Sequence, residues 1–320
     1  MKTIIKSIIA ISVAAAALAA CGSSSNSGIS SNSGNSSKMK AEEYSYKAME
    51  LNCPVKSIDV RTYEASCEFG EVIKGELTYG NYLELDKAGN VIRMTEYNST
   101  GDVDLVRMFK YDEQNNTIEE MLYSREGELE GLQKTEYNDA GKVVKSFTYA
   151  EDGSIERSEE YEYEDEYCVR SRYVKYDENV ATIEEEWVAK RDGERILETT
   201  MYRNGKLEEV HKFSKYEYNV LAECVIYDAD GVKLWEFYQE NDGHGIELHK
   251  SHDFTDNSET EYRVKRNDRG HRVYIYDSQV EHKETYYEYE YDSKGNWTKK
   301  VMFEGVMKKP VEIIEREIKY

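Results

Sequence analysis

The chain has little proline and few basic residues, and only one of its segments is strongly apolar. Two prolines in 320 residues, together with 28 tyrosines, are not the composition of a disordered protein. Lysine and arginine number 42 against 64 aspartates and glutamates, which gives a net charge of −22. A chain this acidic repels nucleic acid, and no basic patch interrupts it, so we expect no nucleic-acid partner.

The sequence also lacks the motifs of several enzyme classes. It contains no Gly-x-Ser-x-Gly motif, no Cys–His arrangement and no glycine-rich phosphate loop before a helix. No two cysteines have the Cys-x-x-Cys spacing of a redox or zinc site. We therefore expect no bound metal, no cofactor and no enzymatic activity.

The strongly apolar segment lies at the N-terminus and ends at a cysteine. Two lysines precede an apolar run over residues 8–17, and small residues then lead into Cys21. The run is too short for a membrane-spanning helix, which needs about 20 residues. A charged start, an apolar run and a small-residue cleavage site are typical of a secretory signal. We assign residues 1–20 to a signal peptide.

The stretch Leu18-Ala19-Ala20-Cys21 resembles the lipobox of bacterial lipoproteins, in which the cysteine at the cleavage site is acylated. The resemblance implies that Cys21 is the lipid-attachment residue and that the mature protein is diacylated or triacylated there, with acyl chains such as palmitate. The protein would then work outside the cytoplasm, with the membrane as its partner through this lipid. Gly22 rather than aspartate follows the cysteine, which in such lipoproteins favours the outer membrane.

Three further segments follow the signal peptide. Residues 21–38 are rich in serine, glycine and asparagine, which is typical of a flexible tether. Residues 39–52 form a short N-terminal segment with a weak helical pattern. Residues 53–320 form a β-repeat domain.

An internal repeat dominates this domain. A tyrosine is followed four residues later by a glycine and then by an aliphatic residue, as in Tyr137-Gly141-Val143. Glycine supplies the positive φ of a tight hairpin, and a strand with period-2 alternation follows. Tyr111, Tyr137 and Tyr163 are each 26 residues apart, a period typical of stacked arrays. We predict an all-β protein, an antiparallel β-hairpin repeat array that forms a curled or spiral sheet.

The repeat resembles the YD repeat of Rhs-type bacterial proteins over roughly residues 75–305. The closest match is Tyr289-Glu290-Tyr291-Asp292-Ser293-Lys294-Gly295-Asn296. The resemblance implies consecutive hairpins in a long antiparallel sheet that coils into a shell. Large members enclose a C-terminal toxin domain, whereas this chain ends in a strand-like stretch, so toxin delivery is not carried over. It also looks like short Gram-negative lipoproteins that carry such repeats.

The tyrosines could form an aromatic platform for sugar or peptide, or they could serve only as cross-strand pairs that stabilise the sheet. The regular spacing favours the structural role, and Trp187, Trp235 and Trp297 are interpreted as packing residues as well. Period-2 alternation places Tyr287, Tyr289 and Tyr291 on one face and Tyr286 on the other, beside Glu288 and Glu290. Because unpaired carboxylates are not buried, the first three tyrosines should point inward.

Three other groups of residues have weaker patterns. On a strand His249 and His252 face opposite sides, which argues against a zinc site with His244. The stretch Asp228–Gly231 fits a hairpin turn better than a calcium loop. Cys53 and Cys67 could form a disulfide, which is permitted outside the cytoplasm, or all four remaining cysteines could be free thiols.

The leading hypothesis is a membrane-anchored extracytoplasmic lipoprotein with a non-enzymatic binding or structural role in the cell envelope. Its ligand would be a protein or a glycan. The alternative is a cell-surface hydrolase that acts on glycan or peptide with paired carboxylates. With 64 acidic residues, neighbouring glutamates such as Glu159-Glu160 or those of residues 184–186 arise by chance. They cannot be assigned as a glycosidase pair, because the required separation is not readable from sequence, and we name no catalytic residue.

Replacing Cys21 by alanine should abolish acylation, because the side-chain sulfur that would bear the lipid is gone. Metabolic labelling with a palmitate analogue measures this directly. A Cys53→Ala protein should label like the unaltered chain, and a Cys21→Ala protein that still takes up label would disprove the lipoprotein assignment.

Overall fold

The computed structural model describes residues 49–320, apart from 179, 194, 218–219, 242–245 and 282. The signal peptide, the proposed lipid site Cys21, the tether and most of the segment 39–52 lie outside the described residues. In the described part no helix is long and apolar enough to cross a membrane.

Twenty strands form one antiparallel sheet. The first ten are β1 (Ser57–Glu68), β2 (Glu71–Leu85), β3 (Val91–Tyr97), β4 (Val103–Tyr111), β5 (Thr117–Ser124), β6 (Leu129–Tyr137), β7 (Val143–Tyr149), β8 (Ile155–Glu164), β9 (Tyr167–Asp177) and β10 (Val180–Asp192). The others are β11 (Arg195–Arg203), β12 (Lys206–Glu217), β13 (Val220–Asp228), β14 (Lys233–Asn241), β15 (Ile246–Asp253), β16 (Ser258–Arg266), β17 (Arg272–Asp277), β18 (Glu284–Tyr291), β19 (Trp297–Glu304) and β20 (Lys309–Lys319).

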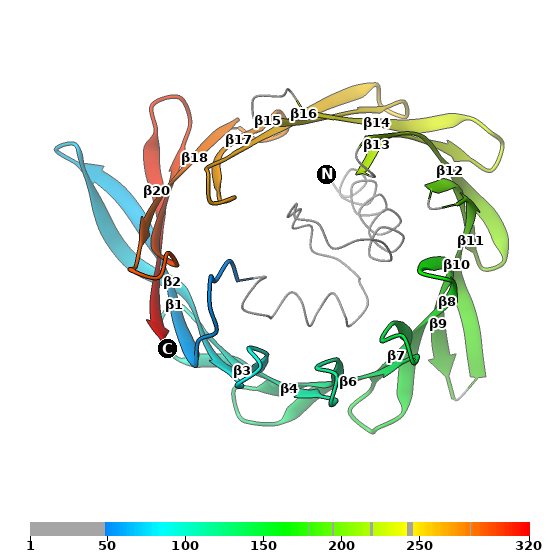
Figure 1. The fold of residues 1–320 in the computed structure, drawn as a ribbon, viewed down its shortest axis with the longest axis horizontal. Coiled ribbons are helices and arrows are strands. Elements are labelled where there is room, and N and C mark those ends of the chain that lie inside the picture. Colours follow the sequence, from blue (N-terminus) through cyan, green and yellow to red (C-terminus); the bar gives the residue numbers. More distant parts are fainter. Residues whose placement is uncertain (1–48, 179, 194, 218–219, 242–245, 282) are drawn as a thin grey trace.

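The sheet closes on itself (Figure 1). Each strand pairs with the next along the chain, and β20 pairs with β1, with Ser57 opposite Lys319 and Thr62 opposite Ile314. The expected all-β antiparallel array is confirmed. In place of a curled or spiral sheet the structure has a closed barrel, because the outer edge of β1 finds its partner in the last strand.

The hairpins form two different rims. We call the rim with the β2–β3, β4–β5, β6–β7 and β18–β19 turns the narrow rim, because these turns lie inside the ring in Figure 1. The opposite rim carries the β1–β2 and β19–β20 hairpins, which flare outward, and we call it the wide rim. The barrel therefore opens more widely at one end than at the other.

The repeated turn follows from its first residue and its glycine. At the β18–β19 turn the Asp292 carboxylate accepts hydrogen bonds from the backbone N–H groups of Lys294 and Asn296. Gly295 takes the positive φ of 82° that the turn needs. The β13–β14 turn is built in the same way on Asp228, which accepts hydrogen bonds from two backbone N–H groups. The expected hairpin at this position is confirmed.

The repeat tyrosines at the narrow rim join neighbouring hairpins. The hydroxyl of Tyr111 donates to the Val91 carbonyl at 2.6 Å, and that of Tyr163 donates to the Val143 carbonyl at 2.9 Å. Tyr137 makes the same bond, again to a carbonyl 20 residues earlier in the chain. Each bond ties one 26-residue unit to the previous one, so the structural interpretation of these tyrosines is confirmed.

Residues 49–56 identify the inward face of the sheet, because they lie inside the ring in Figure 1. Leu51 and Val55 pack there against Ile58, Val91 and other buried side chains of β1–β4. The neighbouring positions along each strand point outward. The inward face is therefore the one that combines the apolar core with the repeat tyrosines of the narrow rim, such as Tyr111.

The four tyrosines of β18 take the faces predicted from the sequence. Tyr287, Tyr289 and Tyr291 alternate with outward residues, and the Tyr289 hydroxyl donates to the Arg272 carbonyl on the inner wall. Tyr286 points outward, yet it packs against a small cluster around Val301 and is not fully exposed. The cluster forms on the outer wall beside the long β1–β2 hairpin.

The possible Cys53–Cys67 disulfide does not form, because the two thiols lie at opposite ends of β1. Cys53 contacts the Asn296 amide at the narrow rim, whereas Cys67 pairs with Val72 beside the wide-rim turn. A disulfide needs Cα atoms within about 7 Å, far less than the length of a 12-residue strand. None of the four cysteines in the described part of the chain is in a disulfide, and of these four only Cys168 and Cys224 are buried.

The histidines of β15 also separate as the alternation predicts. His249 faces inward between Phe237 and Tyr262, and His252 stacks outside on Phe254 at 4.2 Å. His244 lies outside the described residues.

Replacing Tyr111, Tyr137 and Tyr163 together by phenylalanine should lower the free energy of unfolding by about 3 kcal/mol. Each substitution removes one hydrogen bond worth about 1 kcal/mol, and the three sites lie on separate hairpins. Urea denaturation followed by circular dichroism gives the value.

The matched control is the triple phenylalanine variant of Tyr97, Tyr123 and Tyr149, the repeat tyrosines of the wide rim. There the Tyr123 hydroxyl meets only a weak acceptor, the Met121 thioether, at 3.6 Å. We expect a loss below about 1 kcal/mol. Equal losses in the two variants would contradict a structural role specific to the narrow rim.

Candidate binding site in the barrel lumen

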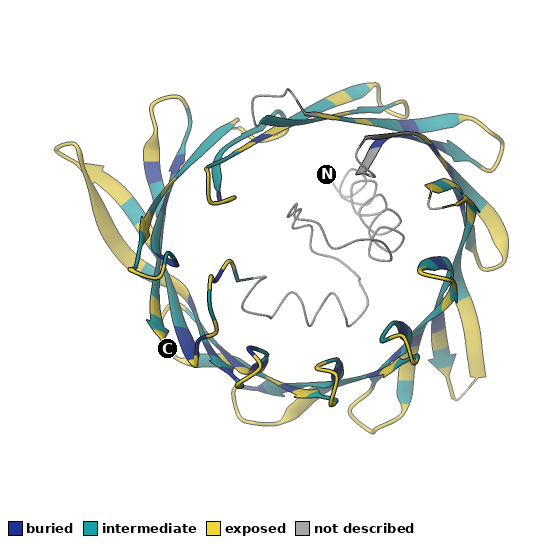
Figure 2. Cartoon of the chain, in the orientation of Figure 1, coloured by how far each residue is buried: buried dark blue, intermediate teal, exposed yellow. Residues whose placement is uncertain are grey.

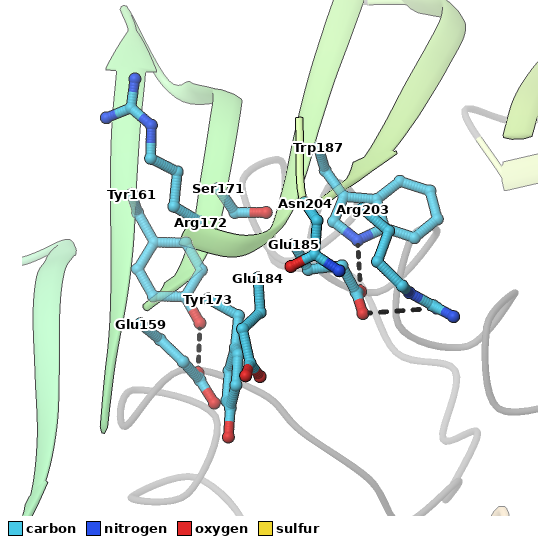
Figure 3. Close-up of a pocket in the computed structure, with 10 residues that line it drawn as sticks. All are labelled: Glu159, Tyr161, Ser171, Arg172, Tyr173, Glu184, Glu185, Trp187, Arg203 and Asn204. Carbon is cyan, nitrogen blue, oxygen red and sulfur yellow. Dashed lines mark hydrogen bonds and ion pairs between the residues drawn. The ribbon is translucent and has the colours of Figure 1, made fainter. Parts of the chain in front are cut away.

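A pocket of about 460 Å³ opens on the inward face where β8, β9, β10 and β11 lie side by side (Figure 3). Its walls combine aromatic rings, carboxylates and small polar side chains. The lining residues are Glu159, Tyr161, Ser171, Arg172, Tyr173, Glu184, Glu185, Trp187, Arg203 and Asn204.

Strand register arranges the lining side chains in two cross-strand rows. In the first row Ser171 stands between Tyr161 and Trp187. The serine is much smaller than the rings on either side, which leaves a hollow between them. In the second row Tyr173 stands between Glu159 and Glu185. The rings of Tyr161, Tyr173 and Trp187 therefore each have a glutamate carboxylate close by.

A bulge in β10 adds a further carboxylate to the pocket. The pairing of β10 with β9 shifts between Ile183 and Glu185, so that Glu184 is an extra residue at this point. Its backbone carbonyl accepts a hydrogen bond from the Asn204 N–H, which fixes the bulge against the β11–β12 turn. Glu184 and Glu185 consequently both reach the pocket.

Hydrogen bonds hold two rings against two carboxylates. The Tyr161 hydroxyl donates to Glu159 Oε2 at 2.7 Å, and Trp187 Nε1 donates to Glu185 Oε1 at 3.1 Å (Figure 3). Burial, with the adjacent Glu159 carboxylate, raises the pKa of the Tyr161 phenol well above its ordinary value. Tyr161 therefore remains a protonated donor across the physiological range.

The charges of the pocket sum to an excess of negative charge. Three glutamates line it against two arginines, and both arginines pair with further glutamates outside the pocket. Arg172 binds Glu186 at 2.8 Å on the outward face, and Arg203 binds Glu208 at 3.0 Å. Arg203 also lies 3.6 Å from Glu185 within the pocket and partly neutralises that carboxylate. One negative charge remains in excess, which favours a cation.

The Trp187 ring packs against a buried histidine. The indole meets the buried His211 edge-on at 5.1 Å, and His211 Nε2 lies 2.8 Å from the Glu209 carboxylate. Further along the inner wall, a cluster that includes Cys224 and Trp235 fills the space between strands. Burial raises the pKa of the Cys224 thiol to about 12, which keeps this thiol protonated and unreactive.

A second inward cluster holds the start of the described chain. The Arg316 guanidinium lies 3.3 Å from the centroid of the Trp297 ring and donates to the Met49 carbonyl. Trp297 Nε1 in turn donates to the Glu50 carboxylate. Burial lowers the pKa of Arg316 to about 9. We call this group the N-terminal clamp, and we assign it a structural role.

The sequence assigned no functional role to the residues of this pocket. Of the neighbouring glutamates that the sequence could not assign as a pair, Glu159, Glu184 and Glu185 come together in the pocket. Glu160 and Glu186 point outward and pair with Lys145 and an arginine. Sequence reasoning missed Tyr173, Ser171 and Arg203, since no signal in one strand reveals its partner in the next. Trp235 and Trp297 are buried packing residues as predicted, but Trp187 borders the pocket.

Comparisons with known proteins give only remote likenesses. No protein-family model matches the chain, and no curated protein matches it. A porin-like protein from Bacteroides uniformis ATCC 8492 is similar over 83% of this chain and 97% of that chain, with 10% identity and a TM-score of 0.35. A DUF1329 family protein from Desulfovibrio piger ATCC 29098 is similar over 89% and 92%, with 7% identity and a TM-score of 0.15. Likenesses this low assign no family.

The barrel should lose stability as the pH falls below about 6.5, because burial lowers the pKa of His249 and of His271 in the folded state. In that range the unfolded chain binds protons that the folded chain does not, so the free energy of unfolding decreases with falling pH. Replacing both histidines by glutamine should flatten this dependence between pH 6.5 and about 5. Urea denaturation at several pH values tests it, and an unchanged slope would contradict the assignment.

Proposed function

We propose that the chain is a lipid-anchored, non-enzymatic binding protein of the bacterial cell envelope, tied to the outer membrane through Cys21. In this proposal the barrel lumen holds a ligand that presents a cationic group, such as an ammonium or a guanidinium. One observation carries it: the pocket sets the rings of Tyr161, Tyr173 and Trp187 beside Glu159 and Glu185. Aromatic faces and carboxylates together attract organic cations.

The outward face supports a location in water rather than within a bilayer. Ion pairs lie along the outer wall, among them Lys110–Glu119 at 2.5 Å and Lys145–Glu160 at 2.6 Å. A barrel that spans a membrane presents this face to lipid, where a lysine or arginine at mid-depth costs about 2–4 kcal/mol. Several such residues would make insertion of the ring costly, and a lipid at Cys21 supplies the attachment instead.

The hydrolase alternative is favoured by one feature, the gathering of three glutamates in one pocket. Two of them already accept hydrogen bonds from ring donors, Tyr161 and Trp187. This arrangement uses the carboxylates to position rings, which suits a binding surface better than proton transfer to a substrate.

The proposal is tested by the pair of variants Glu159→Gln and Glu160→Gln. The two residues are neighbours in β8, but Glu159 faces the pocket and Glu160 binds Lys145 on the outer wall. With spermidine and triarginine as cationic probes, we expect Glu159→Gln to weaken binding about tenfold, which is about 1.4 kcal/mol. Glu160→Gln should change the affinity less than about twofold. Isothermal titration calorimetry measures both.

Trp187 offers an internal reporter of the same event. Its fluorescence should change on titration with the cationic probes, and this change should disappear in Trp187→Phe, which keeps the other two tryptophans. Equal binding of neutral maltotriose, unaffected by Glu159→Gln, would contradict a cation site. Turnover of a glycan or peptide that Glu159→Gln abolishes would favour the hydrolase.

A further inference from the structure

Exposed apolar side chains gather on the wide rim of the barrel. Of its ten hairpins, eight carry at least one large apolar residue that is exposed among the described residues. The most prominent are Phe69, Val306 and Met307, with exposed fractions of 106%, 82% and 92%. The full set is Phe69, Val72, Ile73, Leu129, Val180, Ile183, Leu207, Val232, Phe254, Val280, Val306 and Met307.

The rest of the described surface differs from this rim. Its exposed large apolar residues are scattered over strands on both faces, which is ordinary for a protein surface. They are Tyr79, Ile92, Met108, Leu197 and Tyr238. Turns on both rims begin with an aspartate or asparagine that caps backbone N–H groups, as Asp112 does on the narrow rim and Asp228 on the wide rim. Turn tips do not need apolar residues to form, so folding does not explain the pattern on the wide rim.

We propose that the wide rim docks on a lipid bilayer, with its hairpin tips inserted at the boundary between headgroups and acyl chains. A ring of tips at one end of a barrel meets a flat surface at many points, whereas a peptide or a compact protein would touch only a few. Figure 2 shows the flared hairpins of this rim as exposed segments around the ring. Phenylalanine, methionine, leucine and valine are side chains that partition into this boundary.

The segment that precedes the barrel is long enough for the wide rim to contact the same bilayer that holds the lipid on Cys21. Cys21 precedes Met49 by 28 residues, which span up to about 95 Å when extended. The longest strand, β2, has 15 residues and measures about 50 Å. A lipid on Cys21 and the wide rim can therefore reach the same membrane. In this respect the inference rests on the proposed envelope location.

The acidity of the chain selects the kind of lipid. A net charge of −22 repels an anionic surface, so the rim should prefer zwitterionic lipid. The rim would supply the second contact and would orient the barrel with its wide mouth toward the bilayer.

The test uses the mature chain with Cys21→Ser, which carries no lipid, so that the result does not depend on acylation. Flotation with phosphatidylcholine vesicles should show binding of this protein. The rim variant Phe69→Ser, Val306→Ser and Met307→Ser should partition at least tenfold more weakly. The matched variant Ile92→Ser, Met108→Ser and Leu197→Ser, which removes exposed apolar residues away from the rim, should stay within twofold.

Each other outcome overturns the inference. Absence of vesicle binding by the unlipidated chain, or an equal loss in both triple variants, excludes the rim as a lipid-docking surface. A protein that is dimeric in solution and becomes monomeric only in the rim variant shows that a second copy covers the rim instead. Failure of the palmitate label at Cys21 would overturn the anchor alone and leave this result unaffected.

Discussion

The antiparallel pairing of β20 with β1 is the interaction on which the rest of the structure depends. Eight consecutive residue pairs, from Ser57–Lys319 to Glu64–Glu312, close the sheet. An open sheet would leave a row of unpaired backbone groups on each edge strand and would not enclose a lumen. Closure creates a lumen, and with it the pocket and the N-terminal clamp. The clamp lies at this seam, because its Arg316 is a residue of β20.

One repeated unit produces two rims with different chemistry. At the narrow rim a tyrosine hydroxyl donates to a carbonyl of the preceding unit, as Tyr111 does to Val91. At the wide rim the hairpins flare outward and carry apolar tips such as Phe69 and Met307. The narrow rim thus stabilises the barrel, while the exposed apolar tips of the wide rim remain available for the proposed contact with a lipid bilayer.

Strand alternation gives neighbouring residues different tasks. Glu159 holds a ring inside the pocket, while Glu160, next to it, binds a lysine on the outer wall. Glu185 and Glu186 divide in the same way. Glu159-Glu160, an acidic pair in the sequence, is therefore divided between the two faces of the sheet, and the pocket brings Glu159 of β8 together with Glu184 and Glu185 of β10.

The sequence by itself determined the local architecture. Turn residues with glycine, period-2 alternation and the 26-residue spacing of Tyr111, Tyr137 and Tyr163 specify hairpins and the face of each side chain, because these features depend only on neighbours along the chain. The hairpin at Asp228 and the opposite orientations of Tyr286 and Tyr289 were predictable for this reason.

Only the tertiary structure decided whether the sheet closes and which side chains of different strands become neighbours. The number of strands that completes a ring depends on twist and stagger summed over the whole sheet, and no single hairpin encodes it. The pocket joins Glu159 to Trp187 across three strands, through a register that one sequence does not reveal. The same register places Cys53 and Cys67 at opposite rims, because an extended strand separates residues that are close in the sequence.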